Sequence, residues 1–81
     1  MRVAEDLADQ LAIEALKAEE ITGDVRIIDD LANMMGATSQ TAEEAFLTAV
    51  RVRRANIKAR KMLAERVTAF KAAKASASQP D

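Results

Sequence analysis

The chain has 81 residues, of which 49% are hydrophobic and 31% charged, and its formal net charge is −1. This length makes one domain, near the lower limit for a chain that folds alone. The sequence has no Cys and no His, which excludes disulfides, thiol catalysis, and metal sites or acid–base catalysis that use either residue. It also has no Gly-rich phosphate loop and no carboxylate pair placed for catalysis, so we expect a protein that is not an enzyme. We expect no cofactor, no metal and no small-molecule substrate.

We expect neither a signal peptide at the N-terminus nor a membrane-spanning segment. The first six residues are acidic and lack the apolar region of a signal peptide, and no apolar run approaches the ~20 residues of a membrane span. We therefore expect a cytoplasmic protein that does not contact a membrane. Residues 1–75 are expected to form a single helical domain, and the polar segment 76–81 a disordered tail.

Residues 2–22 are predicted to form a first helix, because apolar residues recur there with helical spacing. The predicted apolar face consists of Val3, Leu7, Leu11, Ala18 and Ile21, together with Ala4, Ala8 and Ala15. Glu14 falls within the same face. Either the helix rotates locally and exposes Glu14, or the half-buried carboxylate pairs with an arginine, for which Arg66 is the natural candidate.

A second helix is predicted over residues 25–35. Gly23 suits a left-handed C′ position after the first helix, and Asp24 can cap the second. The expected buried residues are Ile27, Ile28, Leu31, Met34 and Met35. The two adjacent Met residues fit either gap-filling in a small core or an adaptable binding surface. Gly36 is expected to end this helix.

A third, long helix is predicted over residues 41–75, where no Gly or Pro interrupts a run of good helix formers. Thr41 and Glu44 fit a capping box at its start. At 1.5 Å per residue this helix is a rod of roughly 50 Å, which is too long for an 81-residue monomer to cover. The fold class is therefore all-α, a helical hairpin or bundle completed by oligomerisation, and we expect a homo-oligomer.

Apolar residues along the long helix form two stripes. The first has heptad spacing and includes Asn56 at an a position, where Asn can fix register and strand number. We define this stripe as the seam; its members are Ala45, Ala49, Val52, Asn56, Ala59, Leu63, Arg66, Phe70 and Ala73. The residues expected at the oligomer interface are Val52, Asn56, Ala59, Leu63, Val67 and Phe70. The second stripe, a third of a turn away, consists of Phe46, Val50, Ile57 and Ala64. The alternative is an ordinary amphipathic core helix without a partner.

Charge is distributed unevenly between the two halves of the chain. Residues 1–44 hold eleven acidic and three basic residues, whereas residues 45–81 hold nine basic and two acidic residues. Three explanations fit this asymmetry: the halves fold against each other, they attract between chains, or the basic half meets a polyanion. Arg51, Arg54, Lys58 and Lys61 recur along one face of the long helix; we call them the basic stripe. This stripe binds a polyanion if it is unpaired, and otherwise it pairs with acidic residues of the first helix.

The segment from Leu31 to Phe46 resembles a helix-turn-helix. Ala32 is small where two helices approach, Gly36 stands at the turn and can take positive φ, and Ala42 is small where the second helix faces the first. The run from Asp30 to Thr41 is similar to the corresponding segment of bacterial regulators of the CRP/FNR class. By this resemblance Thr38, Ser39 and Gln40 would open the recognition helix, and Gln40 would contact an adenine.

A helix-turn-helix-like segment that leads into a long oligomerising helix also resembles the small subunit of viral terminases, which form rings and present DNA to a packaging motor. This resemblance implies a self-assembling DNA packaging or regulatory factor with DNA as its partner. The alternative is a helical protein–protein interaction module, such as an adaptor, chaperone or anti-regulator, whose partner is a protein and which binds no nucleic acid.

Overall fold

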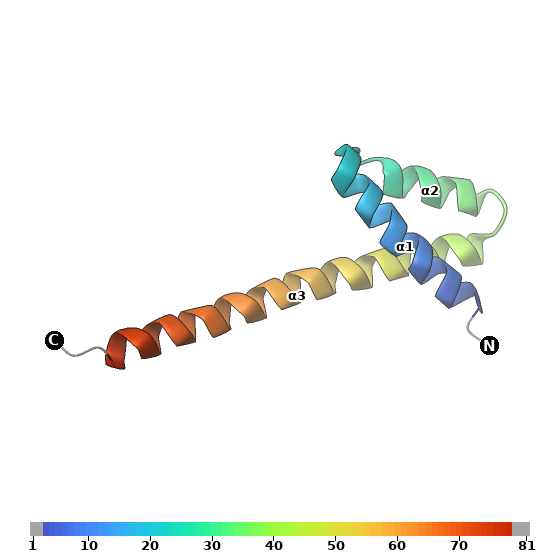
Figure 1. Cartoon of the computed structure of the whole chain (residues 1–81). Coiled ribbons are helices and arrows are strands. Elements are labelled where there is room, and N and C mark those ends of the chain that lie inside the picture. Colours follow the sequence, from blue (N-terminus) through green and yellow to red (C-terminus); the bar gives the residue numbers. More distant parts are fainter. Residues whose placement is uncertain (1–2, 79–81) are drawn as a thin grey trace.

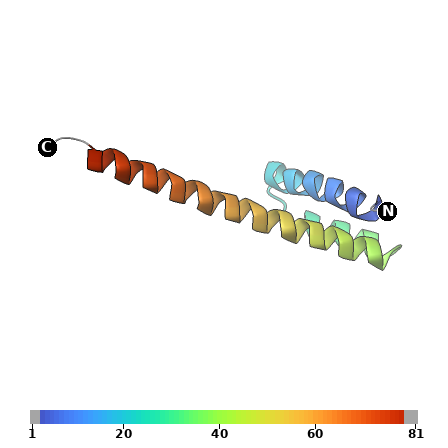
Figure 2. The same cartoon turned by 90° about the horizontal axis from the view of Figure 1, so that it is seen from below.

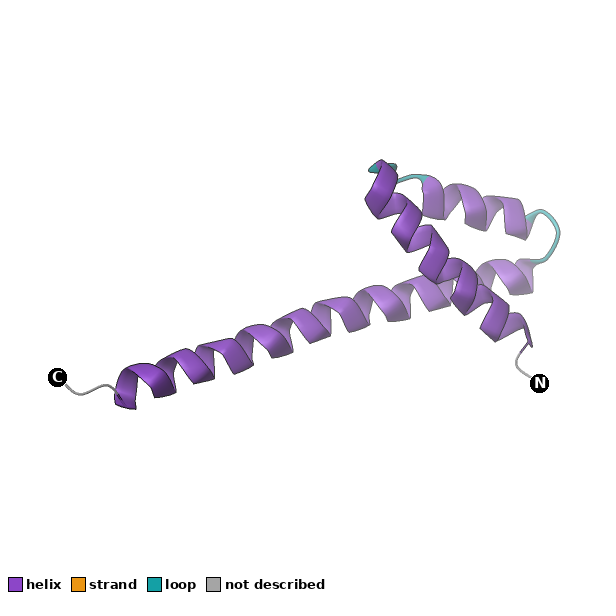
Figure 3. Ribbon diagram, in the orientation of Figure 1, coloured by secondary structure: helices purple, strands orange, loops and turns teal. Residues whose placement is uncertain are grey.

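The computed structural model describes residues 3–78 and contains three helices, with no strand in that range (Figures 1 and 3). They are α1 (Val3–Thr22), α2 (Ile27–Gly36) and α3 (Gln40–Ser78). The all-α fold class is confirmed. Among the described residues, α3 is the longest element with 39 residues, against 20 in α1 and 10 in α2.

The turn between α1 and α2 follows the sequence expectation at Gly23, but the prediction that Asp24 caps α2 is wrong, because Arg26 is the N-cap residue and no side chain caps that helix. Gly23 has a φ of 70°, and its N–H donates to the Glu19 carbonyl 2.8 Å away, so it occupies the left-handed position at the end of α1. Asp24 Oδ1 accepts a hydrogen bond from the Arg26 N–H at 3.0 Å. The Asp24 carboxylate therefore stabilises the turn, and α2 begins at Ile27, two residues later than predicted.

The turn between α2 and α3 differs from the expectation in two respects. Gly36 is the last residue of α2 and, unlike Gly23, does not have positive φ. The predicted capping box at Thr41 is wrong, because α3 begins one residue earlier, at Gln40, and Ser39 caps it. Ser39 Oγ accepts a hydrogen bond from the Ala42 N–H at 3.1 Å.

Helix α3 also ends later than predicted. It continues to Ser78, so residues 76–78 are helical, although the sequence predicted a disordered tail from residue 76. Ala and Ser fill these positions, and nothing in them stops a helix before Pro80. The rest of the predicted tail, residues 79–81, lies outside the described residues.

The core lies where α1 and α2 cover the first third of α3. Phe46 and Val50 of α3 are 0% and 1% exposed, and they pack with Ile28 and Ala32 of α2. Helix α1 contributes three small residues, Ala8, Ala12 and Ala15. Because these side chains end at Cβ, α1 can approach the other helices closely. We call residues 3–50, which contain this core, the head.

The buried face of α1 agrees with the prediction only in part. Of the predicted face, Ala8 and Ala15 are buried and Leu11 is half-buried, whereas Val3, Leu7 and Ile21 are exposed. Ala12, which was not predicted, completes a stripe of alanines at intervals of four and three residues. Helix α1 therefore packs through this small-residue stripe, with Leu11 and Leu16 half-buried against the core.

The molecule is a short head from which α3 projects (Figures 1 and 2). Its extents are 68 × 32 × 13 Å and its radius of gyration is 18.9 Å. A compact chain of this length would have a radius of gyration of about 12 Å. The prediction that the long helix outgrows its own fold is therefore confirmed.

Candidate interaction site on helix α3

The seam of α3 is uncovered beyond the head. The seam residues Val52, Leu63 and Phe70 are 61%, 64% and 68% exposed. Val67, which is predicted at the interface but is not a seam member, is 44% exposed. Every residue from 54 to 77 is exposed, including Asn56 and Ala59. All six residues predicted to form the oligomer interface are therefore accessible on one chain.

The start of the second stripe of α3 is buried in the head. Phe46 and Val50 are buried against α1 and α2, but Ile57, on the same stripe, is 59% exposed and Ala64 is exposed as well. The first two seam residues, Ala45 and Ala49, are half-buried against the same core. The alternative of an ordinary core helix therefore describes only the first third of α3, and both stripes are exposed beyond it.

Two arginines of α3 bind acidic residues of α1, so folding of one half of the chain against the other explains part of the charge asymmetry. Arg53 donates from Nε and Nη2 to the two carboxylate oxygens of Asp9, both at 2.6 Å. These hydrogen bonds, with a smaller charge attraction, lower the pKa of Asp9 and raise the pKa of Arg53. Both side chains remain partly exposed, at 47% and 36%. The pair fixes how α1 crosses α3.

Only one of the four residues of the basic stripe forms an ion pair with another described residue. Arg54 Nη2 lies 3.1 Å from Glu19 Oε2 of α1, so this member is paired, as the alternative for the stripe anticipated. Arg51, Lys58 and Lys61 are exposed and have no ion-pair partner among residues 3–78. Three of the four predicted polyanion-binding cations are thus accessible along α3.

Glu14 and Arg66 do not pair within the chain. Glu14 is exposed on α1, which agrees with the first of the two alternatives, and Arg66 is exposed on the projecting part of α3. Neither forms a salt bridge with a described residue. Asn56 is engaged only locally, since its Oδ1 accepts a hydrogen bond from Arg60 Nε at 2.9 Å.

The predicted recognition residues lie at the start of α3, away from the basic stripe. Thr38, Ser39 and Gln40 are all exposed in the turn before α3 and at its first residue. The Ser39 hydroxyl is occupied as the helix cap. Arg51 lies eleven residues beyond Gln40, or ~16 Å along the helix axis, so the structure does not bring the two predicted groups together.

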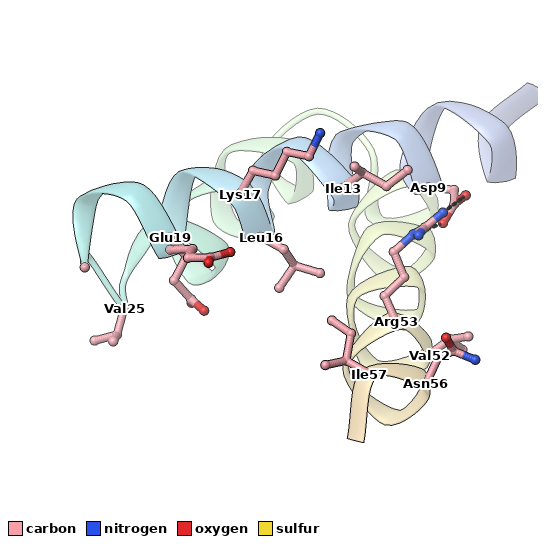
Figure 4. Close-up of a pocket in the computed structure, with 12 residues that line it drawn as sticks. Asp9, Ile13, Leu16, Lys17, Glu19, Val25, Val52, Arg53, Asn56 and Ile57 are labelled. Carbon is pink, nitrogen blue, oxygen red and sulfur yellow. Dashed lines mark hydrogen bonds and ion pairs between the residues drawn. The ribbon is translucent and has the colours of Figure 1, made fainter. Parts of the chain in front are cut away.

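Sequence reasoning missed an open groove between α1 and α3, which we call the α1–α3 groove (Figure 4). Its volume is about 730 Å³, and it opens because α1 crosses α3 and the carboxyl-terminal half of α1 leads away from it. Apolar side chains from both helices and from the following turn line it: Ile13, Leu16, Val25, Val52 and Ile57. The Asp9–Arg53 pair lies at one end. The sequence signal that could have indicated this groove is the apolar pair Val52 and Ile57, one from each stripe of α3.

Within residues 3–78, no three acidic side chains gather closely enough to hold a metal ion. In the same part of the chain, no helix combines the length and apolarity that crossing a membrane requires. Comparisons of the chain with protein-family models, with curated proteins and with solved structures found no match. The surfaces of α3 and the head are therefore the features of this chain from which a function can be inferred.

Proposed function

We propose that this chain is a non-enzymatic, self-assembling helical protein that engages DNA or a machine that handles DNA. It would act as a packaging or regulatory factor of the small-terminase or helix-turn-helix type. The observation that carries the proposal is the projection of α3, whose residues 54–77 are all exposed although they include Leu63, Val67 and Phe70. Large apolar side chains in a continuous stripe mark an association surface.

Assembly through the seam leaves the basic stripe accessible. At 3.6 residues per turn, Arg51, Lys58 and Lys61 lie roughly on the opposite side of α3 from Val52 and Leu63. A second chain on the seam would therefore not cover these cations. Repeating them in an assembly multiplies the contacts with phosphates, and each neutralised phosphate releases counterions.

The experiment has two parts. Light scattering across a concentration series should give a mass well above the 8.8 kDa of one chain. DNA affinity should then fall steeply with salt, and the triple variant Arg51→Ala, Lys58→Ala, Lys61→Ala should reduce the slope of log K against log salt by up to about 2.7 for duplex DNA. Arg26→Ala, an exposed cation outside α3, is the control. A mass of one chain at all concentrations contradicts self-assembly, and an unchanged salt slope contradicts DNA binding by the stripe.

A protein–protein interaction module is the second candidate, and the acidic head favours it. Residues 3–50 contain eleven acidic and two basic residues, and Glu44 is exposed beside the predicted recognition end. Helices α2 and α3 run in roughly opposite directions in both views (Figures 1 and 2), as in a helical hairpin. DNA-binding helix-turn-helix motifs place their helices at about 90–120°. Assembly without any shift of a DNA probe at low salt would support this candidate.

A further inference from the structure

The heptad spacing of the seam allows a two-fold antiparallel register centred on position 61. Residues at equal distances from this position then pair: Ala59 with Leu63, Asn56 with Arg66, and Val52 with Phe70. In heptad terms, each pair joins an a position to a d position, which is the layer pairing of two antiparallel helices. Two copies of α3 related by a two-fold axis at this position would therefore bring each residue opposite its match.

Each of these layers is chemically complementary. Ala59 leaves room for the larger Leu63, and the side-chain oxygen of Asn56 can accept a hydrogen bond from the Arg66 guanidinium. Parallel helices would instead place Arg66 opposite its own copy. Two like charges in one apolar layer are unfavourable.

Charge on the rest of the chain favours the same direction. In this register Lys74 lies opposite residue 48 of the acidic head of the other chain, and Arg66 lies opposite Asn56, at the groove that Glu20 also lines. Lys71 is the third distal cation. These three cations are exposed and have no ion-pair partner in the described part of the chain. Parallel pairing would bring the cations of two chains together, so it loses this attraction.

The α1–α3 groove is continuous with the seam, because Val52 and Asn56 belong to both. Phe70 of an antiparallel copy lies opposite Val52, at the mouth of the groove. Phe70 is 68% exposed on a single chain, whereas Phe46, the other aromatic residue, is fully buried. An aromatic side chain that fills an apolar pocket commonly contributes a large share of the binding energy of an interface.

We propose that the α1–α3 groove receives Phe70 of a second copy of this chain, in an antiparallel two-fold dimer of α3. Phe70 of the second copy would contribute its apolar ring. The side chains of Leu16 from α1 and Ile57 from α3 line the groove that would receive this ring (Figure 4). By symmetry the dimer contains two such contacts. This proposal rests on the self-assembly proposed above and specifies its geometry.

Cross-linking tests the direction of the helices, and the absence of native Cys makes it unambiguous. The variants Ala59→Cys and Leu63→Cys are oxidised separately and as an equimolar mixture, and the products are identified by intact mass. An antiparallel dimer gives a disulfide between the two different variants in the mixture and none in either variant alone. A disulfide in each variant alone indicates parallel helices and overturns the proposal. Met34→Cys mixed with Leu63→Cys is the control, because Met34 lies on α2 outside the groove.

A double-mutant cycle tests the groove. Dissociation constants of the dimer are measured by sedimentation equilibrium for Phe70→Ala, Ile57→Ala and the double variant. Phe70→Ala should weaken the dimer tenfold or more, Ile57→Ala severalfold, and the double variant by less than the product. Met62→Ala, an equally exposed apolar position outside the groove, should combine with Phe70→Ala as the full product. A full product for Ile57→Ala as well would overturn the groove contact.

The experiments distinguish failure of the antiparallel groove proposal from failure of the self-assembly proposal. A mass of one chain at every concentration would overturn both. An oligomer by mass that gives no cross-link in the mixture would leave self-assembly standing and overturn the antiparallel register. A bound small molecule found in the purified protein, with no effect of Phe70→Ala on mass, would assign the groove to a different occupant and overturn the proposal.

Discussion

Replacement of Leu63 by Ala tests whether the seam of α3 is an association surface. Leu→Ala removes three carbon groups, and each buried CH₂ contributes about 0.8 kcal/mol, or ~2.4 kcal/mol for full burial. Leu63 is 64% exposed on one chain, so an interface can newly bury about two thirds of this amount, ~1.5 kcal/mol. A two-fold interface contains the side chain twice, which gives ~3 kcal/mol and a roughly 100-fold weaker dimer.

Sedimentation equilibrium measures this dissociation constant, and circular dichroism at 222 nm checks that α3 remains helical. Met62→Ala is the control, since Met62 is adjacent to Leu63, is 58% exposed and lies off the seam. Leu, Met and Ala are all good helix formers, so neither substitution should unfold the rod. We expect Met62→Ala to change the dissociation constant by less than threefold. Equal effects of the two substitutions would refute the assignment of the interface to the seam.

Three further predictions concern the head. Phe46→Ala empties a fully buried site and should destabilise the head by ~3–5 kcal/mol in chemical denaturation. Gly23→Ala meets no neighbouring atom but forces Ala to a φ of 70°, so it should destabilise the chain by ~1–2 kcal/mol, also measured by denaturation. Asp9 has a pKa below its unfolded value of about 3.9, so its pairing with Arg53 stabilises the fold above that pH and is lost as pH falls through the folded pKa. Asp9→Asn should therefore lower the melting temperature at pH 7 and narrow the difference between pH 7 and pH 3.

The existence of three helices and the length of the third could be predicted from local signals. Helix formers, the position of Gly23 and the absence of Gly and Pro between residues 40 and 79 act within a few residues of one another. The start of α3 was misplaced because Ser39 and Thr41 both carry a hydroxyl that can cap a helix. The choice between them depends on the course of the turn after Gly36, which the local sequence does not specify.

The buried face of α1 could not be predicted from hydrophobicity alone. Leu7 and Ile21 have larger apolar side chains than Ala8 and Ala12, and a helical wheel therefore turns them inward. In the structure α1 packs through its small-residue stripe, with Leu11 and Leu16 half-buried beside it. The choice of this face involves contacts between residues far apart in the sequence, such as the Asp9–Arg53 pair.

The candidate site could be predicted only in part, because some of its features depend on contacts between residues far apart in the sequence. Exposure of Val52, Leu63 and Phe70 follows from the length of α3, which the sequence specifies locally. The α1–α3 groove does not, because it depends on the direction in which α1 leaves α3 after their crossing. Likewise, the sequence located the basic stripe but could not tell that Glu19 of α1 reaches Arg54 and leaves Arg51 accessible.

The charge asymmetry constrains how assembly and polyanion binding can coexist. Pairing within the chain involves two arginines of α3, and seven cations of this helix remain exposed without an ion pair among the described residues. If all seven bound a polyanion, the acidic heads would lie along it and oppose binding. The proposed antiparallel dimer would separate two groups of them, because the distal cations Arg66 and Lys74 would approach the acidic part of the other chain and the cations of the basic stripe would face outward. Partial neutralisation of the heads and an outward basic face would both favour binding of a polyanion through one surface of a chain whose net charge is −1.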